Sequence, residues 1–515
     1  MTPLTPAAKA ALVAAVRHWR DRDLDDYVAV ERGRPGELAL LLEPESDAEL
    51  AALIRALREH RVTTCTVAGQ SGLVEAQRPH GVAIGMKRFA GVHELILPDG
   101  ARAAPADFAA AVAGRPVVAL RGARVRVGAG TAIDAVNEAL APAGLKLPIV
   151  MGSTASASAG ACAANGSAGA NAVRYGTAAD LVRHARGVLG TGEIVAEDVA
   201  PRPMARDPEQ CAIRSDRFLR GDSLVGSQGA LGLITEVTYE VVPLPRDQAL
   251  ALLPVPDVAT AAHLLGQIQA RFDRDGQAVE LYEIVARETL RAAAAHAGQS
   301  LRDDVRDAPF YALLAVVSDT ASAPSAFGSA FVEEVVGFLL GEALGRDGAP
   351  LYADGGFDFD HAPARLIRVR EACSDMSRLL PKQTYDVVVP LAQLDAFTAD
   401  LAREAWRAHP ALRLNLFGHG GVGALHLHAV ASDPDTLERE RAALDTLVFD
   451  LVQHRGGSPW AEHGVGRKWG REWQRRTPRA VQEEMLRLKR RRDPDNVVGS
   501  RLFGFHRLLG EPERD

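Results

Sequence analysis

The sequence predicts an α+β protein with more than one domain, and three observations support this class. The chain has 515 residues, 47% of them hydrophobic, which is enough to form several buried cores. Residues 38–68 follow a strand–helix–strand pattern, with apolar runs on either side of an amphipathic segment. Between residues 257 and 455, helix-length amphipathic segments alternate with strand-length apolar runs. We therefore expect sheets covered by helices rather than a repeat array.

Charge and cysteine content argue against several classes of function. The formal net charge is −7, so no broad basic surface is expected to attract nucleic acid. Four cysteines lie far apart without a CxxC pair, which indicates neither a disulfide framework nor a thiolate zinc site. No apolar stretch is long enough to form a transmembrane segment, and no clear signal-peptide cleavage site is present. We expect a soluble, cytoplasmic protein.

The first predicted unit ends in a polar turn. Leu38–Leu42 is the first predicted strand, and Ser46 and Glu49 have the spacing of a capping box at the start of the following helix. Val62–Ala68 is the next predicted strand, and the tight turn Gly69–Gly72 follows it directly. A β-α-β unit with such a turn is a common cradle for a phosphate-bearing cofactor.

Residues 151–177 contain almost no large side chains. Five glycines and nine alanines occur among these 27 residues, which close with Arg174 and Tyr175. A segment of this composition cannot form its own core, but its backbone can approach another group closely and present N–H groups to an anion. The alternative is a flexible linker. The direct passage into the apolar run Leu181–Leu189 favours an ordered segment of close approach.

A third glycine-rich segment precedes the expected domain boundary. Three glycines between residues 226 and 232 lead into a strand predicted at residues 237–241. Prolines follow at positions 243 and 245, so we place a domain boundary near residue 245. Beyond it, the predicted helices cover residues 257–272, 287–298, 325–344 and 391–408, and the predicted strands include 311–317 and 385–390.

A histidine-rich hairpin is the most specific local signal. Apolar residues flank Gly420–Gly423 on both sides, which predicts two strands joined by this turn. His426 and His428 are two residues apart and therefore point to the same face, which His419 can reach from the other strand. Three imidazoles there can hold a metal ion, and Glu462 can supply a carboxylate as the fourth ligand. The alternative is three histidines with structural hydrogen bonds only.

Taken together, these motifs resemble the FAD-linked oxidoreductases of the vanillyl-alcohol oxidase/PCMH type. More narrowly, they are similar to the D-2-hydroxyacid dehydrogenase branch, which contains D-2-hydroxyglutarate dehydrogenase, D-lactate dehydrogenase and the glycolate oxidase flavoprotein subunit. The resemblance covers about residues 40–500. The matching segments, in the family's order, are Ala68–Val74, Gly152-Ser153, Asn165 with Gly169, Arg174–Thr177, Gly226–Gly232, Gly418-His419, His426, Glu462–Gly466 and Asp493-Pro494.

The resemblance implies a specific division of the chain. Residues 1–245 would form a PCMH-type FAD-binding domain of two α+β subdomains. Residues 246–455 would form an α+β cap domain with an antiparallel sheet, which binds the substrate and the metal. Residues 456–515 would form a C-terminal segment that returns to the FAD domain.

The resemblance also implies that FAD binds between the two subdomains. Binding is expected to be non-covalent, because the turn Ala68–Val74 lacks the histidine that covalently flavinylated relatives carry. Two positions depart from the family: Glu75-Ala76 replaces two glycines and Gln228 replaces a glutamate, but neither change removes a backbone donor. The implied FAD-binding residues are Ala68, Gly69, Gln70, Ser71, Gly72, Leu73, Gly152, Ser153, Ser156, Ser158, Ala159, Gly160, Asn165, Gly169, Arg174, Tyr175, Gly176, Gly229, Gly232 and Ile234.

The family binds zinc or a similar divalent ion with two histidines, an asparagine and a glutamate. Here His419, His426 and Glu462 match, and His428 stands at the place of the asparagine, so zinc is the expected ion. As a Lewis acid, the ion would ease deprotonation of the substrate hydroxyl. His463 would accept that proton as catalytic base, and hydride would pass to flavin N5. The alternative role for His463 is support of the metal ligands.

The resemblance assigns the substrate carboxylate to the segment before the strand at residues 385–390. Arg370 matches the family's substrate arginine, whose planar fork suits a carboxylate. Ser374 follows one helical turn later and matches a family threonine. The lysine of hydroxyglutarate-type members is Thr384 here, although Lys382 is close, which weakens the case for a dicarboxylate.

The expected function is oxidation of a D-2-hydroxy acid to the 2-oxo acid. Electrons would leave the FAD to a quinone, an electron-transfer flavoprotein or another carrier. One alternative is a flavin oxidase that uses oxygen directly. Another is a redox-silent FAD-binding subunit of a larger complex. The sequence leaves open the substrate and its chirality, the identity of the metal, the electron acceptor and the oligomeric state, with a homodimer as one option.

Overall fold

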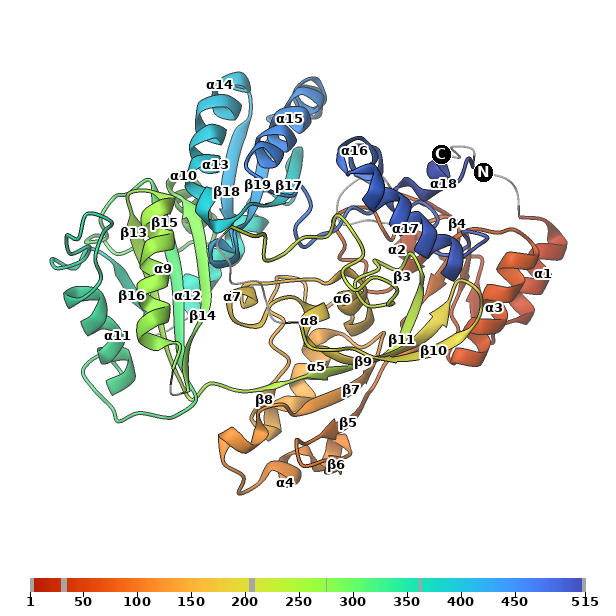
Figure 1. The fold of residues 1–515 in the computed structure, drawn as a ribbon, viewed down its shortest axis with the longest axis horizontal. Helices are drawn as coiled ribbons and strands as arrows, with labels where there is room; N and C mark the ends of the chain where they lie inside the picture. Colours follow the sequence, from red (N-terminus) through yellow and green to blue (C-terminus); the bar gives the residue numbers. More distant parts are fainter. Residues whose placement is uncertain (1–3, 29–34, 203–208, 275, 361–363, 512–515) are drawn as a thin grey trace.

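Four β-sheets organise the part of the chain that the computed structural model describes, which comprises residues 4–28, 35–202, 209–274, 276–360 and 364–511 (Figure 1). They have four, six, two and seven strands. The strands of the six- and seven-stranded sheets pair antiparallel throughout. Helices pack against the sheets, so the expected α+β class with antiparallel sheets is confirmed.

The four-stranded sheet contains the first predicted unit. Helix α3 (Asp47–Glu59) begins after Ser46, whose Oγ accepts a hydrogen bond from Glu49 N at 3.3 Å. The Glu49 carboxylate accepts from Glu45 N rather than from Ser46 N, so only half of the expected capping box is present. Helix α1 (Pro6–Ala14) packs beside α3 on the same face. The strands, in spatial order, are β1 (Trp19–Arg20), β2 (Glu37–Leu42), β4 (His80–Gly85) and β3 (Thr64–Val67).

The six-stranded sheet carries the third glycine-rich segment at its centre. The strand predicted at residues 237–241 begins earlier, because Gly232 and Ile234 already pair with Leu189 and Gly187. Helix α5 (Ile133–Leu140) covers this sheet. The strands, in spatial order, are β10 (Ile194–Asp198), β9 (Val182–Leu189), β11 (Gly232–Glu240), β7 (Arg124–Gly128), β5 (Val92–Ile96) and β6 (Arg102–Ala103). The two-stranded sheet pairs β8 (Leu145–Lys146) with β12 (Val242–Pro243).

The seven-stranded sheet has helices on both faces. One face contacts α9 (Val258–Phe272), α11 (Ala330–Gly341) and α13 (Leu394–Asp400), and the other contacts α10 (Arg287–His296) and α12 (Ala364–Asp375). The helix predicted at residues 325–344 is shorter, since Ser329 caps α11 by accepting from Val332 N. The strands, in spatial order, are β16 (Asp358–Asp360), β13 (Asp247–Val255), β15 (Phe310–Ser318), β14 (Gln277–Ala286), β18 (Arg413–Gly418), β19 (Ala424–Val430) and β17 (Lys382–Val388).

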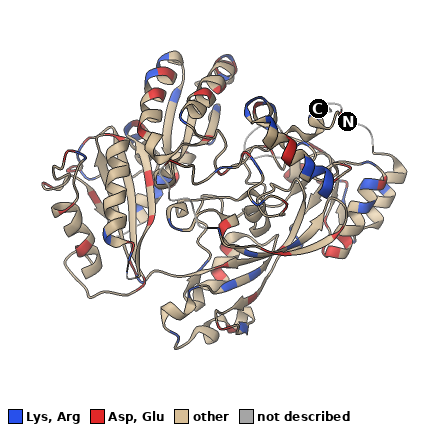
Figure 2. Cartoon of the chain, viewed as in Figure 1, with Lys and Arg blue, Asp and Glu red and all other residues tan. Residues whose placement is uncertain are grey.

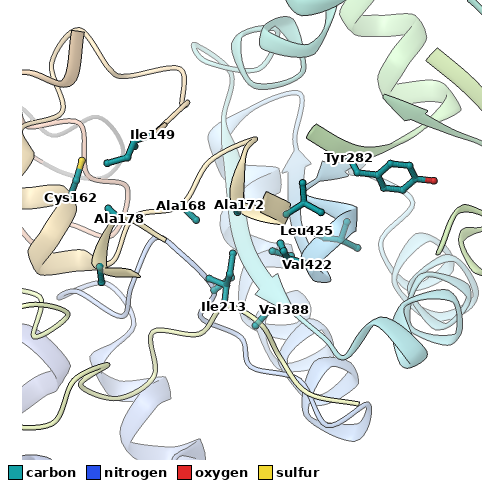
Figure 3. Close-up of a cluster of buried hydrophobic side chains, with 14 of the residues drawn as sticks. Ile149, Cys162, Ala168, Ala172, Ala178, Ile213, Tyr282, Val388, Val422 and Leu425 are labelled. Atoms are coloured by element: carbon teal, nitrogen blue, oxygen red, sulfur yellow. The ribbon is translucent and has the colours of Figure 1, made fainter. Parts of the chain in front are cut away.

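The small-residue stretch is ordered and joins the sheets. It contains the short helices α6 (Ala159–Asn165) and α7 (Ala172–Tyr175) and leads into α8 (Ala178–Leu181). Figure 3 shows Ala172 beside Val422 and Leu425 of the histidine-rich hairpin, and α7 contacts the turn Gly420–Val422. Because its side chains are small, this stretch packs closely against another part of the chain.

The C-terminal helices return to the first two sheets. Helices α16 (Gly470–Arg476), α17 (Arg479–Arg492) and α18 (Phe505–Leu508) follow the long helix α15 (Pro434–His454). The fully buried Lys489 donates to Ala230 O at 2.8 Å and to Asp493 at 2.6 Å. Figure 2 shows acidic and basic residues mixed along the outer helices, with a basic run at the end of α17. In the described residues, no helix combines the length and apolar character needed to cross a membrane.

Candidate active site

A cavity of about 510 Å³ lies where the three glycine-rich segments meet the seven-stranded sheet. Residues 68–77, 151–169 and 228–234 contribute one wall, and Arg370, Phe417 and the histidine-rich hairpin contribute the other. This volume lies in the usual range for ligand and cofactor sites. The expected cofactor-binding residues that line the cavity are Ala68, Gly69, Gln70, Ser71, Gly72, Leu73, Gly152, Ser153, Ser156, Ser158, Gly160, Asn165, Gly169, Gly229, Gly232 and Ile234.

The glycines of the first wall serve two purposes. A Cβ atom at Gly152 or Gly229 would meet nothing within 4 Å, so these glycines leave room at the cavity. A Cβ atom at Gly69 would lie 1.7 Å from Ser156 O, and one at Gly169 would lie 2.0 Å from Val150 O. These two glycines let one loop pack directly on another. The close approach expected from the composition is therefore partly between protein backbones.

Four residues expected at the cofactor lie outside the cavity lining. The Tyr175 hydroxyl donates to Glu280 Oε1 at 3.1 Å, and the Arg174 guanidinium stacks on the Tyr175 ring at 5.0 Å. Gly176 ends α7 with a φ of +73°, and the buried Ala159 begins α6. These residues therefore contribute to the packing between the sheets. Their contact with a cofactor stays a prediction.

Three imidazole rings converge on one oxygen of the buried Glu462. The Nε2 atoms of His419, His426 and His463 lie 3.4, 3.3 and 3.6 Å from Glu462 Oε1. The other oxygen, Oε2, is buried and has no hydrogen-bond partner in the described part of the chain. Imidazole nitrogen and carboxylate oxygen are donors that zinc prefers, so this group fits a divalent ion.

His419 lies between two carboxylates. Its Nδ1 is 2.8 Å from Glu283 Oε1, and its Nε2 faces Glu462. Burial alone would lower the pKa of His419, but the neighbouring Glu462 and Glu283 carboxylates raise it to about 10. Two carboxylates that face one buried imidazole favour a positive charge at this place, which a proton on His419 or a divalent ion can supply.

Asp386 is a candidate site residue that the sequence did not indicate. Its Oδ2 accepts hydrogen bonds from Glu462 N and His463 N, both at 2.7 Å, and lies 3.5 Å from His463 Nδ1. Its Oδ1 lies 3.3 Å from His426 Nδ1. The His426 and His463 rings are nearly parallel, at an interplanar angle of 7°. One ligand atom from each of Asp386, His426, Glu462 and His463 lies within 4.8 Å of the others, so Asp386 is itself a candidate ligand.

His428 and Lys382 lie together, apart from this group. His428 Nδ1 is 3.1 Å from Ser377 Oγ, and Lys382 Nζ donates to Ser377 O at 2.5 Å. His428 shares a face of β19 with His426, as expected, but residues two apart on a strand are separated by about 7 Å. Neither Lys382 nor His428 lines the cavity. Their expected roles at the substrate and the metal stay predictions.

Arg370 lines the cavity and already holds a carboxylate. Its Nε and Nη2 donate to the two oxygens of the buried Glu283, each at 2.8 Å. Burial alone would raise the pKa of Glu283, but Arg370 and His419 hold it well below its usual range. The guanidinium was expected to bind a substrate carboxylate, but two of its nitrogens, Nε and Nη2, are already bonded to Glu283. Glu283 does not contact the third nitrogen, Nη1. Ser374 lines the same cavity one turn further along α12.

Two family models match the chain. Residues 244–501 match the model of FAD linked oxidases, C-terminal domain, and residues 38–197 match the model of an FAD binding domain.

Curated relatives align with most of the chain. It is 26% identical over 451 residues to D-2-hydroxyglutarate dehydrogenase of Xanthomonas citri, covering 86% of this chain and 84% of the relative. It is 27% identical over 482 residues to an uncharacterised FAD-linked oxidoreductase of Mycobacterium tuberculosis, covering 92% and 93%. It is 25% identical over 370 residues to the mitochondrial D-lactate dehydrogenase [cytochrome] of Arabidopsis thaliana, covering 70% and 59%.

Solved structures share the fold at low sequence identity. The structure of p-cresol methylhydroxylase with substrate bound has a TM-score of 0.64, 10% identity and 96% coverage of both chains. The structure of alkyldihydroxyacetonephosphate synthase has a TM-score of 0.60 and 15% identity, covering 97% of this chain and 86% of the other. These findings confirm the PCMH-type FAD-binding fold expected from the sequence.

Proposed function

Because the chain belongs to the FAD linked oxidases, we propose that it oxidises a D-2-hydroxy acid to the 2-oxo acid with non-covalently bound FAD. The observation that carries the proposal is the convergence of His419, His426 and His463 on Glu462 at the wall of the cavity. Relatives named D-2-hydroxyglutarate dehydrogenase and D-lactate dehydrogenase support the same class of substrate.

The residues around the cavity would hold two groups. The loops at residues 68–73, 152–169 and 229–234 would hold the FAD, and His419, His426 and Glu462 would hold the ion, for which zinc is our choice. When bound, the FAD accepts a hydride and the divalent ion polarises the substrate hydroxyl. The position of His428 beside Ser377 does not support its role as a fourth ligand.

His463 is the residue best placed to take the hydroxyl proton. It lines the cavity, and its side chain is 24% exposed, whereas those of His419 and His426 are 4% and 10% exposed. Asp386 Oδ2 lies 3.5 Å from Nδ1 of His463, and Glu462 Oε1 lies 3.6 Å from Nε2. A divalent ion on Glu462 would engage that carboxylate, so Asp386 would hold the hydrogen on Nδ1 and leave a lone pair on Nε2. Nε2 is therefore the atom that accepts the proton in this proposal.

Arg370 would hold the carboxylate of the substrate. Glu283 fixes the guanidinium through Nε and Nη2, so Nη1 is the nitrogen left for a ligand in the cavity. Ser374 can add a hydroxyl donor from the same face of α12.

The finer assignments extend this proposal to the whole chain. We assign FAD binding to residues 1–245, substrate and metal binding to residues 246–455, and the closing C-terminal segment to residues 456–515. Electrons would pass from the reduced FAD to a quinone, an electron-transfer flavoprotein or another non-nicotinamide carrier. A cytoplasmic location completes the proposal.

Anaerobic reduction of the purified protein by a panel of D- and L-2-hydroxy acids tests the proposal. The flavin absorption should bleach with one or more D-acids and not with their L-enantiomers. The flavin should leave the protein on acid precipitation, since binding is non-covalent. Flavin that no hydroxy acid can reduce would contradict the proposal and would favour a redox-silent subunit.

A further inference from the structure

One side chain from the cofactor-facing wall holds the loop that carries Glu462 and His463. Gln228 is buried between this wall and that loop, and its Nε2 donates to Ser215 O at 3.0 Å. Its Oε1 accepts from Val465 N at 3.2 Å, two residues after His463. Gln228 also lines the cavity and directly precedes Gly229, so the same residue touches both walls.

Ser215 holds the other end of the same loop. Its backbone N–H donates to Trp460 O at 2.9 Å, and its hydroxyl donates to Ala461 O at 2.6 Å. Ser215 therefore fixes the residues before Glu462, and Gln228 fixes those after His463. The two are linked by the hydrogen bond from Gln228 to Ser215, so together they form a clamp around the loop.

The backbone on each side of this contact has a conformation that is uncommon. Gln228 has a φ of +55°, which is rare for a residue with a side chain. Gly464 has a φ of +88°, and a Cβ atom there would lie 2.7 Å from Gln228 Oε1. An amide suits the site because one end faces an N–H group and the other faces a carbonyl. A carboxylate would place a second acceptor against Ser215 O.

We infer that Gln228 is a positioning residue, which sets the place of His463 relative to the cofactor-facing loop. The inference rests on the catalytic role proposed above for His463. Bonds from Gln228 cross the cavity wall to the loop that carries the base, so losing them would move the base without removing it. A shift of about 1 Å in a reacting group can cost about 100-fold in rate.

Two variants and a matched control test this inference. Gln228→Met removes both ends of the amide at similar length, and Gln228→Glu keeps the acceptor but replaces the donor by a second, charged acceptor. The control is Gln267→Met, because Gln267 on α9 makes the same kind of clamp at a remote turn. Its Nε2 donates to Leu344 O at 2.7 Å and its Oε1 accepts from Leu344 N at 3.0 Å.

The first readout is stopped-flow flavin reduction in FAD-loaded protein. Gln228→Met should lower the limiting rate by about 100-fold and Gln228→Glu by about 10-fold, while substrate affinity changes by less than about two-fold. Gln267→Met should match the wild type. Equal limiting rates in the Gln228 and Gln267 variants would overturn the inference. If Gln228→Met does not fold, Gln228→Glu decides by the same criterion.

The second readout does not depend on activity. Hydrogen exchange, followed by mass spectrometry, should be faster over residues 460–466 in both Gln228 variants and unchanged there in Gln267→Met. If no hydroxy acid reduces the wild-type flavin, the proposed function fails, and exchange alone decides whether Gln228 holds the loop. Unchanged exchange at residues 460–466 would overturn the inference in either case.

Discussion

The two walls of the cavity are built on opposite principles. Glycine, alanine and serine make up most of the cofactor-facing wall, and its loops pack so closely that a Cβ atom at Gly69 would overlap Ser156 O. The opposite wall presents Arg370, Glu462 and histidines beside Phe417. The buried carboxylates of Glu283 and Asp386 contact these groups from outside the lining. The shape of one wall depends on small side chains, and the chemistry of the other depends on charged and imidazole groups.

This difference indicates which substitutions in each wall should destabilise or inactivate the protein. Added atoms should damage the cofactor-facing wall where its loops contact other backbone, as at Gly69 and Gly169, because no space is left for them there. Removed charges should damage the polar wall, because each buried charge there balances another. The following predictions compare the two walls, beginning with the largest expected effect.

Removal of the divalent ion should abolish turnover and leave the cofactor-facing wall intact. A chelator acts only on the group around Glu462, so the visible absorption of the bound flavin should stay largely unchanged. Metal analysis and steady-state turnover check this prediction, and added zinc should restore activity. Full turnover in protein shown to be free of metal would contradict the assigned metal site.

His463→Ala should slow flavin reduction by about 100-fold or more, because it removes the proton acceptor. FAD content should stay unchanged, since the loops of the other wall are untouched. His454→Ala is the matched control, as His454 is exposed at the end of α15. Rapid-mixing reduction measures both variants, and equal rates would remove the assigned role of His463.

Gly69→Ala and Gly152→Ala should separate the two uses of glycine in the cofactor-facing wall. The first places a Cβ atom 1.7 Å from Ser156 O and should lower the free energy of unfolding by about 3 kcal/mol. The second meets nothing within 4 Å and should change it by less than about 0.5 kcal/mol. Denaturant unfolding of the two variants measures the difference, and equal stabilities would show that the loops do not need the close contact.

The pKa of His80 is lowered in the folded protein, whereas that of His419 is raised, so protonation of His80 at low pH should decrease the stability of the fold. Burial and the nearby Arg501 and Arg467 lower the pKa of His80 to about 3, so the folded protein binds this proton less readily than the unfolded chain. The stabilisation from the neutral ring is complete above pH 6.5 and is lost as the pH falls toward 3.

The variant His80→Gln isolates this contribution. Below pH 6.5, the wild type should lose up to about 1.4 kcal/mol of unfolding free energy per pH unit more than the variant. Denaturant unfolding at pH 7, 6 and 5 gives the two slopes. Parallel slopes would show that the His80 ring does not remain neutral in the folded protein.

Much of the fold could be predicted from local patterns. Ser46 caps α3, and the strands at residues 413–418 and 424–430 flank the predicted turn, because periodicity and turn chemistry are local properties. The extent of β11 could not be predicted, since Gly232 joins that strand only through its pairing with Leu189. Pairing across a sheet depends on a segment distant in the sequence.

The candidate site shows the same limit. The expectation that His419 and His426 meet Glu462 followed from the hairpin pattern and the family resemblance, and the structure places them together. The same alternation places His428 on that face too, but it lies beside Ser377. Asp386 pairs opposite His426, and only the approach of residues 462 and 463 shows that its carboxylate binds their backbone.

The sequence by itself determined the chemistry that is available: loops of small residues, a hairpin with three histidines, and a family assignment that implies FAD. Tertiary structure alone decided which of these groups touch. It engaged Arg370 with Glu283, placed Asp386 behind two histidines and joined the walls through Gln228. The physical reason is that residue type and local spacing specify what a side chain can donate or accept. Its partners are specified by the packing of segments that lie far apart in the sequence, as far as 237 residues for Gln228 and Val465.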